Sequence, residues 1–320
     1  ELRRIDLAAG ARLDIDLPVS PFAHLLEERG IDLALAVDGA AAEELSIRPP
    51  RMGMTAIAGS AHRIELRARA GQGAGAAWLW LHCLDTAQVQ HIERLEALYR
   101  GQLELGSAAA GAALPELETR MATPGDQWSR TWWTHSRAQA LQIAGRYQEA
   151  SIAFDQARDA WLEIGDRARA GVALMAAGEA ASRSGDYKRA DRMADAAIGL
   201  LTDGPMFFLL RSQASKCVTQ GRRGELRAAI DCEAAFAQRY RDLDERSEAA
   251  VRDVSIANQW LVLGDVAAAG RHLGLAQRDW QLLTPAVRAR WLLAMGTLAL
   301  QKTELGTAIQ HYREASSAFE

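Results

Sequence analysis

Histidine and cysteine are the residue types in this chain best suited to catalysis or metal binding, and both are scattered. The seven histidines stand at positions 24, 62, 82, 91, 135, 272 and 311, and no two form a His-x-x-x-His pair on one helix face. Cys83, Cys217 and Cys232 lack CxxC spacing, so we expect buried free thiols, with a Cys217–Cys232 disulfide as the alternative in an exported protein. No nucleophile with its base, carboxylate pair or metal-ligand set forms a motif. The sequence therefore predicts no enzyme active site, cofactor site or metal site in this stretch.

Two further segments could bind a ligand. Gly71-Gln-Gly-Ala-Gly75 superficially resembles a phosphate loop, but it joins two alternating strands instead of opening a helix, so we interpret it as a hairpin loop. Trp78 and Trp80 lie on one side of a strand, where two rings could stack on a sugar. They support an alternative function, a carbohydrate or cell-envelope binding adaptor. We favour the other interpretation, in which they pack against the helices that follow.

Alternating apolar and polar residues predict short strands from Glu1 to about Asp85. Leu13, Ile15 and Leu17 form one such run. Short strands with turns between them imply a small antiparallel β-sandwich over residues 1–86. Beyond it the apolar spacing becomes helical, so the fold class is α+β with two unlike domains.

Five alanines recur at separations of 40, 39, 40 and 39 residues, and each follows a similar turn signal by five residues. A regular period of this kind predicts stacked helix pairs. A small residue also recurs in each first helix, where it would let the two helices of a pair touch. The alanines are Ala150, Ala190, Ala229, Ala269 and Ala308; the turns begin at Gly145, Gly185, Gly224, Gly264 and Thr303; the facing small residues are Ala138, Gly178, Cys217, Ala257 and Gly296.

This pattern of small residues, glycine turns and aromatic residues resembles the tetratricopeptide repeat (TPR) from about Trp132 to Phe319. The resemblance implies an all-α superhelical solenoid over residues 87–320. A degenerate unit is expected at about 92–122, followed by units at about 131–170, 171–209, 210–249, 250–288 and 289–320. Because the family usually repeats every ~34 residues, we expect the second helices of this chain to be longer.

The TPR family binds protein segments on the concave face of the solenoid, which the first helices line. By the repeat register, the lining should comprise Trp132, His135, Gln139, Gln142, Met175, Glu179, Ser182, Val218, Val254, Asn258, Leu261 and Thr297. The family's carboxylate clamp needs repeated Lys and Asn at these positions, and only Asn258 matches, so we reject chaperone-tail binding. Arg222 and Arg223 beside Lys216 are interpreted as a solvated turn, although an acidic partner segment could use them.

The whole chain is similar to the non-catalytic N-terminal part of bacterial proteins in which a β domain and a TPR array precede a caspase-like CHAT peptidase domain. The segments 9–15 and 30–39 look like strands of that leading β domain. The resemblance implies an interaction and regulatory scaffold, which is not itself an enzyme. Its concave face would bind a protein segment or an autologous effector domain after Glu320. An apolar face around Trp291 and Tyr312 has no following helix to cover it, which favours self-association or more chain.

Charge and hydropathy restrict the classes of partner that this chain is expected to bind. The formal charge of -4 comes from 37 basic and 41 acidic residues mixed along the chain, so there is no basic field of the kind that gathers nucleic acid. Apolar runs such as Ala76 to Leu81 are far shorter than the ~20 residues that cross a bilayer. We therefore expect a soluble protein, cytoplasmic or exported after removal of a signal peptide, whose partner is a protein or peptide.

Overall fold

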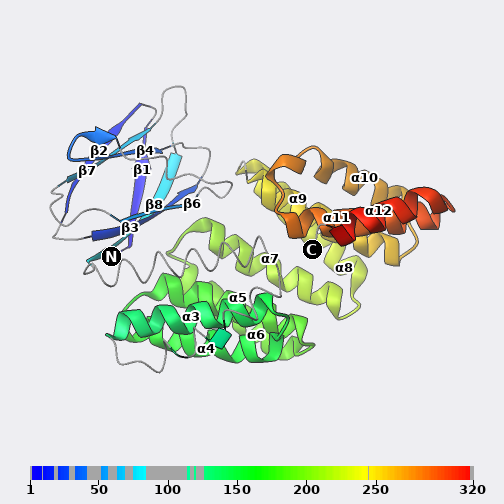
Figure 1. The fold of residues 1–320 in the computed structure, drawn as a ribbon, viewed down its shortest axis with the longest axis horizontal. Coiled ribbons are helices and arrows are strands. Elements are labelled where there is room, and N and C mark those ends of the chain that lie inside the picture. Colours follow the sequence, from blue (N-terminus) through cyan, green and yellow to red (C-terminus); the bar gives the residue numbers. More distant parts are fainter. Residues whose placement is uncertain are drawn as a thin grey trace.

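The structure is a computed structural model of the 320-residue chain, and it describes residues 2–8, 10–17, 21–28, 33–41, 52–56, 63–68, 75–83, 114–115, 119, 126–243 and 245–317. Within these ranges, a region of antiparallel sheet is followed by ten α-helices packed consecutively as a solenoid (Figure 1). The predicted order of an N-terminal sheet region and a helical solenoid is confirmed. The predicted degenerate unit at 92–122 lies outside the described residues except for 114, 115 and 119. The boundary at 86–87 stays a prediction.

Within the described ranges, eight strands form two four-stranded antiparallel sheets. One sheet has the order β1 (Leu2–Leu7), β8 (Gly75–Cys83), β3 (Pro21–Glu28), β6 (Met52–Ala56); the other has the order β2 (Arg12–Asp16), β7 (Arg63–Ala68), β4 (Leu33–Val37), β5 (Ala40–Ala41). Ile5 and Leu79 of the first sheet share one hydrophobic cluster with Ile15, Ile64 and Leu66 of the second. The two sheets therefore pack face to face, and the alternation in the sequence marks the residues of that shared core.

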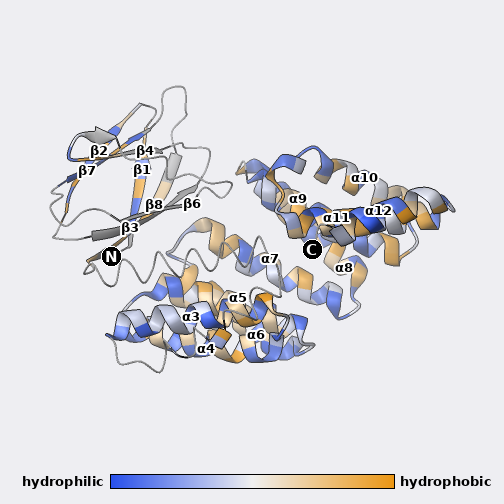
Figure 2. Ribbon diagram, in the orientation of Figure 1, coloured by the Kyte–Doolittle hydropathy of each residue, from blue (hydrophilic) through white to orange (hydrophobic). Residues whose placement is uncertain are grey.

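The ten helices form five antiparallel pairs: α3 (Gln127–Ile143) with α4 (Tyr147–Glu163), α5 (Arg167–Arg183) with α6 (Tyr187–Leu201), α7 (Met206–Arg222) with α8 (Leu226–Asp242), α9 (Arg246–Val262) with α10 (Val266–Gln277), and α11 (Pro285–Gln301) with α12 (Leu305–Ser317). Hydrophobic and hydrophilic stretches alternate along each helix (Figure 2), as expected for amphipathic helices that bury one face. Every first helix has 17 residues and the second helices have 12 to 17. The second helices α4 and α8 are as long as the first helices, whereas α6, α10 and α12 are shorter, so the second helices alone do not account for the length of the repeat.

The turn between the two helices of each pair has a left-handed residue at the predicted place. Gly145, Gly185, Gly224 and Gly264 have φ between 78° and 91°, and Thr303 takes the same conformation with φ 64°. Glycine adopts this conformation without a steric penalty, whereas a β-branched residue is strained there. The weakest of the five turn signals in the sequence is therefore also the strained turn of the structure.

The recurrent small residues lie where the helices of a pair approach each other. All five alanines of the period are at most 2% exposed. A Cβ added to Gly178 would lie 3.3 Å from the backbone oxygen of Ala190, and one added to Gly296 would lie 2.6 Å from the ring of Tyr312. The predicted helix contacts are confirmed, because a larger side chain at either glycine would push its partner helix away.

The strand β8 joins the sheet region to the solenoid. Trp78 and Trp80 are 7% and 5% exposed, and they share a hydrophobic cluster with Leu174 of α5 and Phe207 of α7. The Arg169 guanidinium lies 5.7 Å from the centre of the Trp80 ring, within cation–π range. A sugar stacks only on an accessible ring face. This packing therefore occupies the surface that glycan stacking on these tryptophans would require.

The cysteines differ from the expectation of three buried free thiols. Cys217 of α7 and Cys232 of α8 form a disulfide with their Cα atoms 5.6 Å apart, and Cys83 is free and exposed. Cys217 occupies the small-residue position of its helix, and Cys232 lies three residues beyond the facing Ala229. The close helix contact itself therefore brings the two sulfur atoms together.

Candidate functional site

The first helices share a partly exposed side that is turned away from their second helices. On α5 this side comprises Arg169, Val172, Ala176, Glu179 and Arg183, all at least partly accessible, at intervals of three or four residues. That spacing keeps them on one helix face, roughly opposite the face through which Gly178 contacts α6. We call these residues, together with the solvent-accessible residues at the same positions of the other first helices, the concave surface. Beyond α5 they are Gln139 and Ile143 of α3, Arg211, Ser215, Val218 and Arg222 of α7, Glu248, Val251, Ser255, Asn258 and Val262 of α9, and Val287, Arg290, Thr297 and Gln301 of α11.

The residues predicted to line this surface divide into two groups. Gln139, Gln142, Glu179, Val218, Asn258 and Thr297 are partly exposed, whereas Trp132, His135, Met175, Ser182, Val254 and Leu261 are buried. A buried side chain contacts a partner only if the helices rearrange. The concave surface is thus rotated by about one helix position from the predicted lining, and the binding role of each residue stays a prediction.

His135, which the repeat register assigns to the concave lining, belongs to an aromatic core cluster. Its Nδ1 accepts a hydrogen bond of 3.2 Å from the indole N–H of Trp161, and Trp132 and Phe154 pack around the two rings. Burial, reinforced by the nearby charge of Arg169, lowers the pKa of His135 from 6.5 to about 3. The imidazole is therefore neutral at physiological pH and serves the packing of the first helix pair.

Arginines are further functional candidates, and of these the sequence indicated only Arg222, as a residue that an acidic segment could use. The Arg222 guanidinium, at the end of α7, donates a hydrogen bond of 2.9 Å to Ser182 Oγ. Arg211 of α7 lies 3.5 Å from Glu179 of α5. Arg183, at the end of α5, donates 3.3 Å to the hydroxyl of Tyr147. These contacts link neighbouring repeats and place guanidinium groups along the concave surface.

Two further arginines extend this group onto the C-terminal repeats. Arg252 of α9 approaches Glu233 at 3.7 Å and Glu248 at 4.0 Å. Arg290 of α11 keeps access to solvent, and among the described residues it makes no direct ion pair. Burial lowers the pKa of Arg290, and repulsion from Arg183 and Arg252 lowers it further. The charges of Arg183, Arg252 and Arg290 therefore influence one another although they belong to different repeats.

The positive charges of these arginines also shift the pKa values of other charged groups on the concave surface. Burial lowers the pKa of Arg222, and the neighbouring charge of Arg183 adds to the effect. Burial would raise the pKa of Glu179, but Arg211, Arg183 and two further arginines reverse the shift and lower it. We call Arg183, Arg211, Arg222, Arg252 and Arg290 the arginine cluster.

Arg252 pairs with a buried carboxylate of the neighbouring helix α8. Glu233 of α8 is fully buried, and it stands four residues after the alanine of its repeat, where other repeats carry Phe154 or Leu273. Its Oε1 accepts hydrogen bonds from Ser255 at 2.9 Å and Gln259 at 2.5 Å. Burial raises the pKa of Glu233, although Arg252 and both hydrogen bonds oppose the shift. This departure from the repeat pattern replaces an apolar contact with a polar network beneath the arginine cluster.

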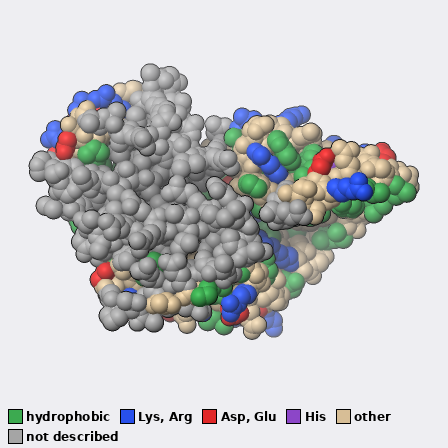
Figure 3. Space-filling view, in the orientation of Figure 1, with side chains coloured by type: hydrophobic (Ala, Val, Ile, Leu, Met, Phe, Trp, Pro, Cys, Tyr) green, Lys and Arg blue, Asp and Glu red, His purple; other side chains and the backbone are tan. Residues whose placement is uncertain are grey.

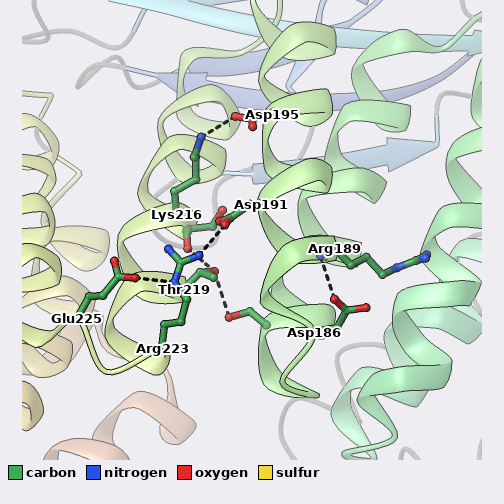
Figure 4. A network of polar contacts seen from close by, with 10 residues as sticks. Asp186, Arg189, Asp191, Asp195, Lys216, Thr219, Arg223 and Glu225 are labelled. Atoms are coloured by element: carbon green, nitrogen blue, oxygen red, sulfur yellow. Dashed lines mark hydrogen bonds and ion pairs between the residues drawn. The ribbon is translucent and has the colours of Figure 1, made fainter.

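The basic residues interpreted from the sequence as a solvated turn are instead paired with the preceding helix (Figure 4). Lys216 Nζ lies 2.6 Å from Asp195, and Arg223 Nη1 lies 3.0 Å from Asp191, both acids being on α6. Thr219 Oγ1 lies 3.1 Å from Ser182 Oγ. Lys216 and Arg223 therefore bridge two repeats, and only Arg222 of the three joins the concave surface.

The described residues show no other kind of site. No group of three His, Cys, Asp or Glu side chains among them could bind a metal ion. None of the helices within the described ranges is both long and apolar enough to span a bilayer.

Five antiparallel helix pairs with small residues at each intrapair contact define the class of this protein: the chain has the fold of tetratricopeptide-repeat proteins. Among solved structures it is similar to NprR in complex with its cognate peptide NprX, at 12% identity over 74% of this chain and 69% of that one, with a TM-score of 0.59. It is also similar to the apo form of RapI, at 14% identity over 73% of this chain and 84% of that one, with a TM-score of 0.50. No protein family and no curated protein matches the sequence. At such low identity, these likenesses show the fold alone.

Proposed function

We propose that this chain is a non-catalytic protein-interaction scaffold whose concave surface binds a segment of another protein. The observation that carries the proposal is the partly exposed side that recurs on the first helices. Trp80 of β8 packs against the part of this side around Arg169 and Val172. A curved surface built by repeats suits an extended segment, because each repeat adds a further row of contacts. The peptide in the NprR complex supports this kind of ligand for the fold.

Selection from a library of random 12-residue peptides displayed on phage tests the proposal, followed by calorimetric titration of the selected peptides. Val218 of α7 is partly exposed near the middle of the concave surface, so Val218→Trp should block binding and weaken it at least tenfold. Ile152 is 50% exposed on the second helix α4, so Ile152→Trp is the matched control and should bind normally. Failure to select any peptide, or equal binding by both variants, would overturn the proposal.

The resemblance to proteins that carry a caspase-like domain supports a finer form of the proposal. In it, the bound segment belongs to an effector domain of the same polypeptide, which the scaffold regulates. Leu305 and Ile309 of α12 are 62% and 51% exposed, and such apolar side chains are suited to contact with a further element or a second copy of the chain. On the face shown in Figure 3, hydrophobic side chains lie among charged ones over the C-terminal helices.

Light scattering at rising protein concentration tests the self-association that this surface favours. The double variant Leu305→Glu, Ile309→Glu should remain monomeric at concentrations where the wild type associates. A monomeric wild type at high concentration would count against self-association. For the effector, the test is binding between this chain and any effector domain encoded in the same reading frame, added as a separate protein.

A further inference from the structure

The arginine cluster gives the concave surface a chemical preference. Arg183 and Arg222 occupy the same register position, the last residue of α5 and of α7. Arg211 and Arg290 also share a position, the sixth residue of α7 and of α11. The solenoid thus brings basic side chains from separate repeats onto one surface.

We propose that the concave surface selects acidic peptide segments, whose Asp and Glu carboxylates bind between Arg183, Arg222 and Arg290. This inference rests on the proposed function and specifies the chemistry of the segment. Guanidinium groups bind carboxylates through paired N–H donors, and such charged hydrogen bonds are stronger where water is partly excluded.

Among the described residues, neither Arg222 nor Arg290 forms an ion pair. Within the described ranges, Glu179 pairs with Arg211, and Glu233 and Glu248 pair with Arg252. Glu233 is fully buried behind Arg252, so it does not reach the open side of the surface. Arg222 donates to a neutral hydroxyl, and Arg290 makes no direct ion pair with the described residues.

The arginines also repel one another, which a bound carboxylate would relieve. Burial and the charge of Arg183 both lower the pKa of Arg222 and that of Arg290. Burial is the larger cause of both shifts, but part of each reflects repulsion between positive charges, so a negative group between the arginines is favoured for two reasons. It attracts each guanidinium, and it screens them from each other.

The distribution of charge favours a peptide over nucleic acid. The whole chain carries a net charge of -4, and basic residues outside the concave surface, such as Lys216 and Arg223, are paired with aspartates. Nucleic-acid binding relies on an extended basic field that contacts many phosphates. A cluster confined to the inside of the solenoid fits a narrow segment with a few carboxylates.

Fluorescence anisotropy with three labelled 12-residue peptides tests the inference: alternating Glu-Ala, alternating Gln-Ala and alternating Lys-Ala. The Glu-Ala peptide should bind at least tenfold more tightly than the Gln-Ala peptide, and its affinity should fall as salt rises from 50 to 300 mM. The double variant Arg183→Gln, Arg290→Gln should lose at least tenfold in affinity for the Glu-Ala peptide. Arg192, exposed on the second helix α6, provides the matched control Arg192→Gln, which should bind like the wild type.

The outcomes separate this inference from the proposed function. If the phage-selected peptides bind but lack acidic enrichment, and the Glu-Ala and Gln-Ala peptides bind equally, the scaffold stands and the acidic preference is overturned. Unchanged affinity in the Arg183→Gln, Arg290→Gln variant, with folding verified by circular dichroism, would also overturn it. A labelled (dT)12 that binds more tightly than the Glu-Ala peptide would assign the cluster to nucleic acid instead.

Discussion

Loss of the Cys217–Cys232 disulfide is expected to destabilise the α7–α8 helix pair by about 3 kcal/mol. The bond joins two residues 15 positions apart on the two helices of one repeat. A cross-link of that length removes about 3 kcal/mol of loop-closure entropy from the unfolded state. Because about 1.4 kcal/mol is a factor of ten in an equilibrium constant, the reduced pair should open on the order of 100-fold more often.

The double variant Cys217→Ala, Cys232→Ala should remove the disulfide without leaving a large cavity. Cys217 occupies the small-residue position at which other repeats carry Ala138 and Ala257. Cys217→Ala therefore retains the close helix contact, and Cys232→Ala removes a partly exposed side chain of α8. The loss of stability in the double variant should then report the cross-link itself.

Amide hydrogen exchange in α7 and α8 is the appropriate assay, because solenoids open repeat by repeat and a global midpoint averages over them. Exchange is compared for oxidised wild type, reduced wild type and the double variant. Cys83→Ser is the control, since Cys83 is exposed and free. The reasoning is refuted if protection of α7 and α8 in the reduced protein and the double variant stays within threefold of that in the oxidised protein.

Three further predictions follow from single residues. Thr303→Gly should stabilise the last turn by about 1 kcal/mol, and Gly264→Thr should destabilise its turn by a similar amount, because glycine takes this left-handed conformation without strain and threonine does not. Chemical denaturation measures both changes. Variants as stable as the wild type would contradict the prediction. Since His135 has a pKa of about 3 in the folded state and 6.5 when unfolded, stability is lost as pH falls below 6.5, by about 2 kcal/mol at pH 5, and His135→Gln should lack this acid loss. Trp80→Ala should cost about 3–5 kcal/mol at the junction and speed proteolysis between β8 and α3; unchanged cleavage would show that the junction does not depend on this ring.

The turns and helix contacts could be predicted from the sequence because they depend on residues close together in the chain. A glycine at the turn and an alanine five residues later lie within one helix pair, so local sterics determine their roles. The same turn and helix contact then recur in five repeats, every 39 or 40 residues. Even the weak signal at Thr303 marked a real turn, where the structure accepts a strained residue.

The concave surface was harder to predict because burial along a helix depends on its rotation. A register error of one residue turns a side chain by about 100°, which exchanges a lining position for a core position. The predicted register therefore includes His135 and Met175 in the lining although they pack in the core, and it leaves Arg183 and Arg222 out of the lining. The available signal was their shared place at the end of successive first helices.

The sequence by itself determined the helix pairs, their turns and the alternating strands of the sheet region, because each rests on contacts within a few tens of residues. Only the tertiary structure decided which residues share a surface across repeats. The charge of Arg183 acts on Arg290, more than 100 residues away in the chain, and this influence depends on how the repeats stack. The burial of Trp78 and Trp80 likewise depends on where the sheets meet α5 and α7. Neither placement is encoded in a local spacing.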